Sequence, residues 1–144
     1  VDITKLATLS GLKRDTIINY LSYLDKAKLI RLLYSDLKNI KRMQKPDKIY
    51  IDNTNLLNAW ATAPIQIGTI RETFVANQLS VNHVVEFRKT NGDFLVDSKY
   101  TFEVGGDDKD FQQIANVADS FILADDMETA IGKKLPIWVV GFDY

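Results

Sequence analysis

The sequence contains no cysteine and a single histidine, His83, in 144 residues. The lack of cysteine excludes disulfide scaffolds, cysteine-ligated zinc sites and thiol catalysis. A single histidine excludes histidine-rich metal sites and argues against a Ser-His-Asp triad, and His83 fits a surface turn better than a catalytic base. No apolar run approaches the 18 residues of a membrane-spanning helix, and no signal peptide is recognisable. We therefore expect a cytoplasmic protein with no membrane partner.

Hydrophobic residues make up 46% of the chain, which is enough to bury a real core. A length of 144 residues fits one ordinary domain or two small ones. The chain starts with Val1 and enters a helical pattern almost directly. From this start we expect a fragment of a longer protein.

The net charge of −1 conceals two halves of opposite sign. Residues 1–50 hold 11 Lys and Arg against 5 Asp, a net charge of +6, whereas residues 51–144 hold 7 against 14 acidic residues, a net charge of −7. Such asymmetry indicates two modules with different partners, and a basic module attracts polyanions such as DNA. The alternative is that two solvated faces differ in sign by chance.

The first part of the chain predicts two helices followed by two strands. Apolar residues at helical spacing mark both helices, and Ser10 and Gly11 between them favour a tight turn. Two β-prone runs then flank a polar, basic loop. The four segments lie at residues 3–9, 13–26, 29–34 and 48–51. This order is typical of a helix-turn-helix with a wing, so we predict a winged helix-turn-helix over residues 1–52 that lacks its first helix.

The remainder predicts a small α/β (α+β) domain over residues 53–144. Asn91 and Gly92 are a strong signal for a hairpin turn between two strands. Helices are expected near 56–60, 69–80 and 109–117, and strands at 84–88, 93–97, 100–104, 120–124 and 136–142. From their apolar patterns we expect buried side chains at Leu21, Leu24, Phe74 and Trp138. Trp60 likewise fits a core position better than a stacking platform.

Three carboxylates occupy positions that could converge on a metal ion. Glu72 lies on a helix before the sheet, and Asp93 and Glu103 lie on neighbouring strands. Mg²⁺ binds one or two carboxylates together with water and phosphate, so Asp93 and Glu103 are candidate magnesium ligands. The alternative is that these acidic residues belong to the solvated surface.

This layout resembles the PD-(D/E)XK nuclease fold, in which an Asp ends one strand and a Glu-x-Lys lies on the next. The corresponding run here places Gly105 where that family has lysine. Lys109 could reach back across the flexible Gly105 and Gly106 and stand in for it. The aspartates near Lys109 compete for its ammonium group, and they also suit the cap of a following helix. These aspartates are Asp107, Asp108 and Asp110.

Most of the chain also resembles the C-terminal region of prokaryotic AAA+ superfamily ATPases. Residues 17–33 and 48–52 are similar to the winged-helix part of those proteins, and 68–75 is similar to a G-x-x-x-E-x-x-V helix. Residues 92–96, 102–106 and 136–142, with Lys109 and Gln113, resemble their nuclease-like C-terminal domain, the domain of unknown function 4143. The resemblance implies ATP binding in a missing N-terminal portion and contact with the parent's own ATPase domain. No G-x-x-x-x-G-K-[ST] run is present in this chain, so we expect it to bind no ATP itself.

The interpretation that follows is an accessory nucleic-acid-binding or coupling module that does not cleave DNA alone. We expect the recognition helix to present Lys13, Arg14 and Asn19 to DNA. The wing would contact phosphates through Lys38, Lys41, Arg42 and Lys45. Two alternatives stay open: a Mg²⁺-dependent nuclease that uses Glu72, Asp93, Glu103 and Lys109, and a module for protein interaction only.

Overall fold

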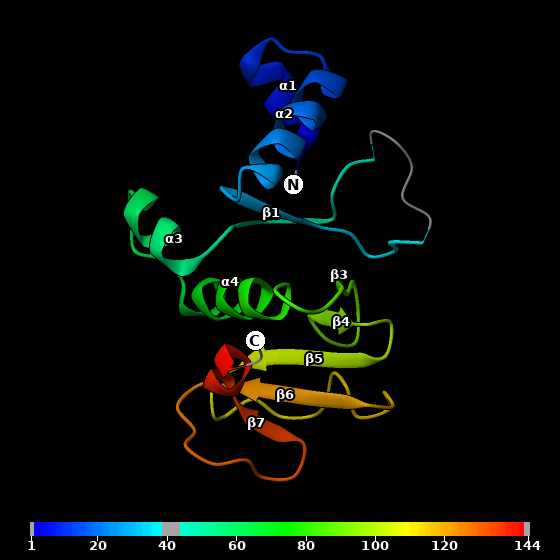
Figure 1. Ribbon diagram of the computed structural model, residues 1–144, viewed down its shortest axis with the longest axis vertical. Helices are drawn as coiled ribbons and strands as arrows, with labels where there is room; N and C mark the ends of the chain where they lie inside the picture. Colours follow the sequence, from blue (N-terminus) through cyan, green and yellow to red (C-terminus); the bar gives the residue numbers. More distant parts are fainter. Residues whose placement is uncertain (1, 39–43, 143–144) are drawn as a thin grey trace.

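The computed structural model describes residues 2–38 and 44–142 (Figure 1). Its N-terminal end holds two helices, α1 (Ile3–Ser10) and α2 (Arg14–Lys26), followed by the strands β1 (Ile30–Leu33) and β2 (Lys48–Ile51). Two further helices follow, α3 (Thr54–Trp60) and α4 (Ile67–Leu79). In the described part of the chain, no helix combines the length and hydropathy needed to cross a membrane.

Local signals set the ends of α1. The Asp2 side chain caps its start by accepting a hydrogen bond from the Lys5 backbone N–H at 3.0 Å. Gly11 ends the helix in the left-handed conformation, with φ of 69°, which confirms the predicted turn. The two helices then pack through a small core formed by Ile3, Ile17 and Ile18.

The two short strands form an antiparallel hairpin. Ile30 pairs with Ile51 and Leu33 pairs with Lys48, so the ladder covers both strands end to end. This order, two helices and then a two-stranded ribbon, agrees with the predicted elements of the first 52 residues. Lys41 and Arg42, which lie in the connecting loop, are outside the described residues.

The second part of the chain is built on a five-stranded mixed sheet in the order β3-β4-β5-β6-β7. The first three strands pair antiparallel and the last three pair parallel. The strands are β3 (Val85–Phe87), β4 (Phe94–Val96), β5 (Tyr100–Gly105), β6 (Ser120–Ala124) and β7 (Lys134–Pro136). Asn91 and Gly92, with φ of 59° and 113°, form the predicted turn between β3 and β4. The chain is therefore of the mixed α and β class, as expected.

One hydrophobic core joins the β1–β2 hairpin to the sheet. Leu33 and Tyr50, each 4% exposed, belong to the same buried cluster as Val75 of α4 and Phe94 of β4. The Phe87 backbone N–H also donates to the carbonyl of the residue after β1, Tyr34, at 2.9 Å. The boundary expected near residue 52 thus falls within a region that shares buried side chains on both sides. The hairpin lies beside α4 and the β3–β4 end of the sheet (Figure 1).

The helix predicted over residues 109–117 is wrong. This segment is a series of turns, with the Lys109 N–H bonded to the Gly106 carbonyl and the Ile114 N–H bonded to the Phe111 carbonyl. The Asp110 side chain accepts from the Gln112 N–H, which gives the backbone a local alternative to a helix. With no helix there, Asp107, Asp108 and Asp110 do not act as its caps.

The strand predicted over residues 136–142 is also wrong. Pairing ends at Pro136, which has no N–H to donate, and Ile137–Phe142 forms a 3-10 helix, η1. Trp138 is therefore 49% exposed instead of buried, and Leu24 is 39% exposed. Leu21 and Phe74 are half-buried. An uninterrupted apolar run does not distinguish a strand from a helix, which explains the error.

Candidate functional site

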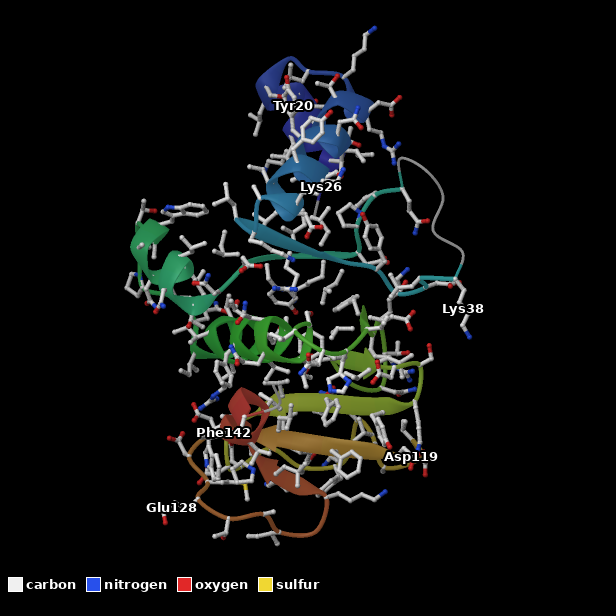
Figure 2. The ribbon with its side chains drawn as sticks, viewed as in Figure 1. Tyr20, Lys26, Lys38, Asp119, Glu128 and Phe142 are labelled. Carbon is white, nitrogen blue, oxygen red and sulfur yellow. The ribbon has the colours of Figure 1, made fainter. Side chains whose placement is uncertain are left out.

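Two candidate sites lie on different parts of the molecule, and the first is the basic surface. Lys13 precedes α2, Arg14 is its first residue and Asn19 lies on its second turn, and all three side chains are exposed. Lys38 and Lys45, at the two described ends of the loop between β1 and β2, are exposed as well. Figure 2 shows the Lys38 side chain extending away from the body of the protein. Within the described residues, no ion pair engages Lys13, Lys38 or Lys45.

The second candidate site is a carboxylate cluster formed by Asp93 and Glu103. Asp93 directly precedes β4, and its backbone N–H donates to the Phe102 carbonyl of β5 at 2.8 Å. Its side chain also contacts β5, because Asp93 Oδ2 accepts a hydrogen bond from the Val104 backbone N–H at 2.8 Å. Glu103 lies on β5 between the two residues that bond Asp93, and its side chain is buried, with 2% exposed. Strand pairing therefore brings together two carboxylates ten positions apart in sequence.

Lys109 reaches back to this cluster. Its Nζ lies 2.5 Å from Glu103 Oε1, and the buried carboxylate is thereby paired. The lysine stem passes over Gly105, where an added Cβ would lie 2.8 to 2.9 Å from Cβ, Cγ and Cδ of Lys109. The absence of a side chain at Gly105 therefore makes room for the Lys109 side chain. Gln113, with its amide nitrogen turned toward Glu103, donates to both carboxylate oxygens at 3.1 and 3.3 Å.

Glu72 is held by the β1–β2 hairpin. Its Oε2 atom accepts from Tyr50 Oη at 2.6 Å and from Lys48 Nζ at 3.1 Å. Lys48 and Tyr50 are two positions apart on β2, so both can face α4 from one side of the strand. The sequence analysis missed both residues. One signal for them was available in the sequence. Lys48 and Tyr50 alternate along a strand, so they share one face, and a later helix carries a carboxylate that this face can contact.

Burial and charge shift the pKa values of this region. Burial is the main cause that raises the pKa of Asp93 to about 6, and the nearby Glu103 and Glu72 charges raise it further. The hydrogen bond from Val104 and the ammonium group of Lys109 oppose this shift. The hydrogen bond to Glu103 raises the pKa of Lys109, which therefore stays protonated. Burial and the hydrogen bond to Glu72 raise the pKa of the Tyr50 hydroxyl.

The donor chemistry of Asp93 and Glu103 fits a magnesium ion with water as its other ligands. Both residues supply carboxylate oxygens, and Asp93 Oδ1 has no hydrogen bond within the described residues. Glu72 is oriented toward β2 by Lys48 and Tyr50, which both bind its Oε2 atom. In the part of the chain that the structure describes, no group of three or more His, Asp or Glu side chains could hold a metal.

His83 lies in a turn after α4. Its Nδ1 atom is 2.6 Å from Asp97 Oδ2, and Asp97 Oδ1 accepts from the Val84 N–H at 2.9 Å. These two contacts lower the pKa of Asp97, the backbone hydrogen bond more than the histidine. His83 therefore contributes to a turn that joins the end of α4 to β3 and β4.

Comparison with known proteins yields no relative. No family model matches the chain, and neither the curated proteins nor the solved structures include a significant match.

Proposed function

We propose that this chain is a nucleic-acid-binding accessory module, the C-terminal part of an AAA+ ATPase. The observation that carries the proposal is a set of exposed lysines that form no ion pair within the described residues, Lys13 at the start of α2 and Lys38 and Lys45 in the β1–β2 loop. A helix-turn-helix with a wing would place α2 in the major groove and the loop on the phosphate backbone. ATP would bind in the N-terminal portion of the full-length ATPase. This chain would bind DNA in the cytoplasm.

The proposed contacts divide into two classes. Lys13, Lys38 and Lys45 would neutralise phosphates, which supplies affinity without sequence preference. Asn19, on the exposed side of α2, would reach base edges. Because the shared core holds the β1–β2 hairpin against the sheet, the wing would meet DNA in a fixed position relative to the carboxylate cluster.

The salt dependence of DNA binding tests this proposal. For a duplex oligonucleotide, we expect log affinity to fall linearly with log salt concentration. Replacing Lys13, Lys38 and Lys45 together by Ala should flatten that slope by up to about 3 units, since each phosphate contact contributes about 0.9. Fluorescence anisotropy of labelled DNA over a salt series measures both slopes.

A matched control is Lys133→Ala, an exposed lysine near β7 that should leave the slope unchanged. A chain that binds no duplex even at low salt would contradict the proposal. The basic surface would then belong to a protein interaction with the ATPase domain.

A second candidate function is metal-dependent cleavage of phosphodiesters. The observation that favours it is the contact between Lys109 and Glu103 across Gly105, because the neighbouring aspartates do not capture the lysine. Asp93 and Glu103 would hold a Mg²⁺, which stabilises charge on phosphate oxygen when bound. Lys109 would orient the attacking water and stabilise negative charge beside it. Gln113 would keep the Glu103 carboxylate in place.

Cleavage assays separate the two functions. The accessory function predicts no nicking of plasmid DNA by this chain with Mg²⁺ or Mn²⁺. The nuclease function predicts nicking that both Asp93→Ala and Glu103→Ala abolish and that Lys109→Met reduces by about 10²-fold or more. Glu72→Gln is the matched control, since it lies next to the cluster but is held by β2. Nicking that survives in Asp93→Ala would indicate a contaminating nuclease and remove support for this candidate.

A further inference from the structure

A cavity of about 340 Å³ lies where α3 and α4 meet the ends of β6 and β7. None of Asp93, Glu103 and Lys109 lines it, so it is distinct from the carboxylate cluster. Its volume falls in the range of about 300–1,000 Å³ that is usual for small-molecule sites. The side chains that matter for recognition are Thr54, Asn58, Arg71, Phe74, Asp125 and Trp138.

The topology of the sheet places this cavity at a favourable edge. Strands β5, β6 and β7 are parallel, so their carboxyl ends meet at one edge of the sheet (Figure 1). Asp125 directly follows β6, and Trp138 follows β7 by two residues. Ligands of sheets with parallel strands bind outside these carboxyl ends, because loops from several strands converge there.

The polar wall of the cavity is held in place by ion pairs. Arg71 is mostly buried, with its side chain 16% exposed. Its Nε atom lies 3.1 Å from Asp125 Oδ2, and its Nη2 atom lies 3.3 Å from Asp126 Oδ2. Of these three groups, only Arg71 and Asp125 line the cavity, so the charges of the guanidinium and the carboxylate balance at its wall and leave no net positive charge to attract an anion.

Trp138 forms the aromatic wall of the cavity. Its indole is held by two contacts and is still exposed to solvent. Its Nε1 atom donates to the Met127 carbonyl at 3.2 Å. Phe142 packs edge-on against it, with 6.0 Å between ring centroids and an interplanar angle of 90°. Even so, Trp138 remains 49% exposed. A half-exposed, oriented indole is a surface on which a planar aromatic group can stack.

The third wall offers hydrogen bonds from α3. The Asn58 Nδ2 atom donates to the Thr54 carbonyl at 2.8 Å, which orients the amide and leaves Asn58 Oδ1 as an acceptor. Asp125 adds a carboxylate whose Oδ1 accepts from the Asp126 N–H at 3.0 Å and whose Oδ2 accepts from Arg71, and each oxygen keeps a second lone pair as an acceptor. The cavity therefore combines one stacking surface, hydrogen-bonding groups at its edge and no excess of positive charge.

The geometry points to a nucleobase-binding site: a planar, uncharged heteroaromatic base stacked on Trp138, with its polar edge toward Asn58 and Asp125. The base can come from a free nucleoside or from an unpaired nucleotide of a single strand. Arg71, the cation at the wall, is already paired with Asp125 and Asp126, so any phosphate would lie outside the cavity. This inference goes beyond the proposed function and does not rest on it, because no residue of the basic surface lines the cavity.

The chain has two tryptophans, which makes Trp138 a usable reporter. In Trp60→Phe, all tryptophan fluorescence comes from Trp138, and we expect adenosine or guanosine to quench it saturably. The matched nucleoside 5′-monophosphates should bind more weakly. Trp138→Phe, which keeps Trp60 as the reporter, should show no saturable quenching. Quenching that rises linearly without saturation for every nucleoside would show collisions in place of binding. It would overturn the claim that the cavity binds a free nucleoside.

Equilibrium dialysis with radiolabelled nucleoside checks the contacts without relying on fluorescence. Trp138→Ala should weaken binding about tenfold or more through lost stacking. Asn58→Ala should weaken it as well, while Asn55→Ala on the same helix should not. Circular dichroism of each variant verifies that the fold persists.

Labelled single-stranded oligonucleotides form the second arm. If the base comes from a strand, their affinity falls in Trp138→Ala while nucleosides do not bind. An oligonucleotide affinity equal in Trp138→Ala and the parent chain, with no nucleoside binding, would overturn the proposal. Duplex binding through Lys13, Lys38 and Lys45 is measured separately, so failure of one proposal leaves the other intact.

Discussion

Replacing Lys109 by methionine is expected to destabilise the folded chain by about 3 kcal/mol. Glu103 is 2% exposed, and removing its cationic partner would leave a buried carboxylate with the Gln113 amide but no opposite charge; breaking a buried ion pair in this way costs about 3–5 kcal/mol. We expect the lower end of that range, because the Lys109 side chain is 29% exposed and water can partly replace it. Urea unfolding followed by circular dichroism measures the change.

The double variant Glu103→Gln with Lys109→Met provides the decisive comparison. A neutral amide at position 103 removes the uncompensated charge, so the double variant should recover much of the lost stability. Lys133→Met is the control for a lysine that is exposed. A Lys109→Met chain as stable as the control would mean that the Lys109–Glu103 ion pair does not stabilise the folded chain.

Leu33→Ala is expected to cost about 2–5 kcal/mol and to shift the unfolding of the whole chain. Leu33 is 4% exposed and packs in one cluster with residues of α4 and of the sheet. Truncating a leucine in such a core leaves a cavity that the neighbours fill only partly. Because the cluster spans both parts of the chain, unfolding should stay a single cooperative transition.

Two probes follow this transition at once. Tryptophan fluorescence in Trp60→Phe reports on η1 through Trp138, and far-ultraviolet circular dichroism reports on all helices and strands. Both midpoints should move together in Leu33→Ala, and Leu9→Ala, at a side chain 75% exposed, should move neither by much. A variant in which only the circular dichroism transition shifts would mean that the β1–β2 hairpin unfolds independently of the sheet.

Local signals predicted most elements of this protein. Gly11 marked the end of α1, and Asn91 and Gly92 marked the turn between β3 and β4, because each position needs a backbone conformation that few residues adopt. The paired apolar segments around the basic loop likewise predicted β1 and β2. These features depend on residues close together in sequence, so a pattern in the sequence is sufficient to find them.

The candidate carboxylate cluster was also partly predictable. The strand pattern predicts Asp93 and Glu103 on neighbouring strands, and the flexible Gly105 predicts that Lys109 can reach back to them, as the Lys109–Glu103 contact confirms. The sequence did not predict the hydrogen bonds from Lys48 and Tyr50 to Glu72, because those residues are more than 20 positions away from it. Their contact arises only because the hairpin packs on α4.

By itself, the sequence determined the helices of the first part with the Gly11 turn between them, the two hairpins, the charge division between the halves and the placement of Asp93 and Glu103 on neighbouring strands. Each of these follows from spacing along the chain or between adjacent strands. Only the tertiary structure decided that Trp138 leaves the sheet, that one core unites the hairpin with α4, and that a cavity opens at the ends of β6 and β7. Those features depend on which surfaces are buried when elements distant in sequence pack together. An apolar segment of the sequence does not show which of those elements will cover it.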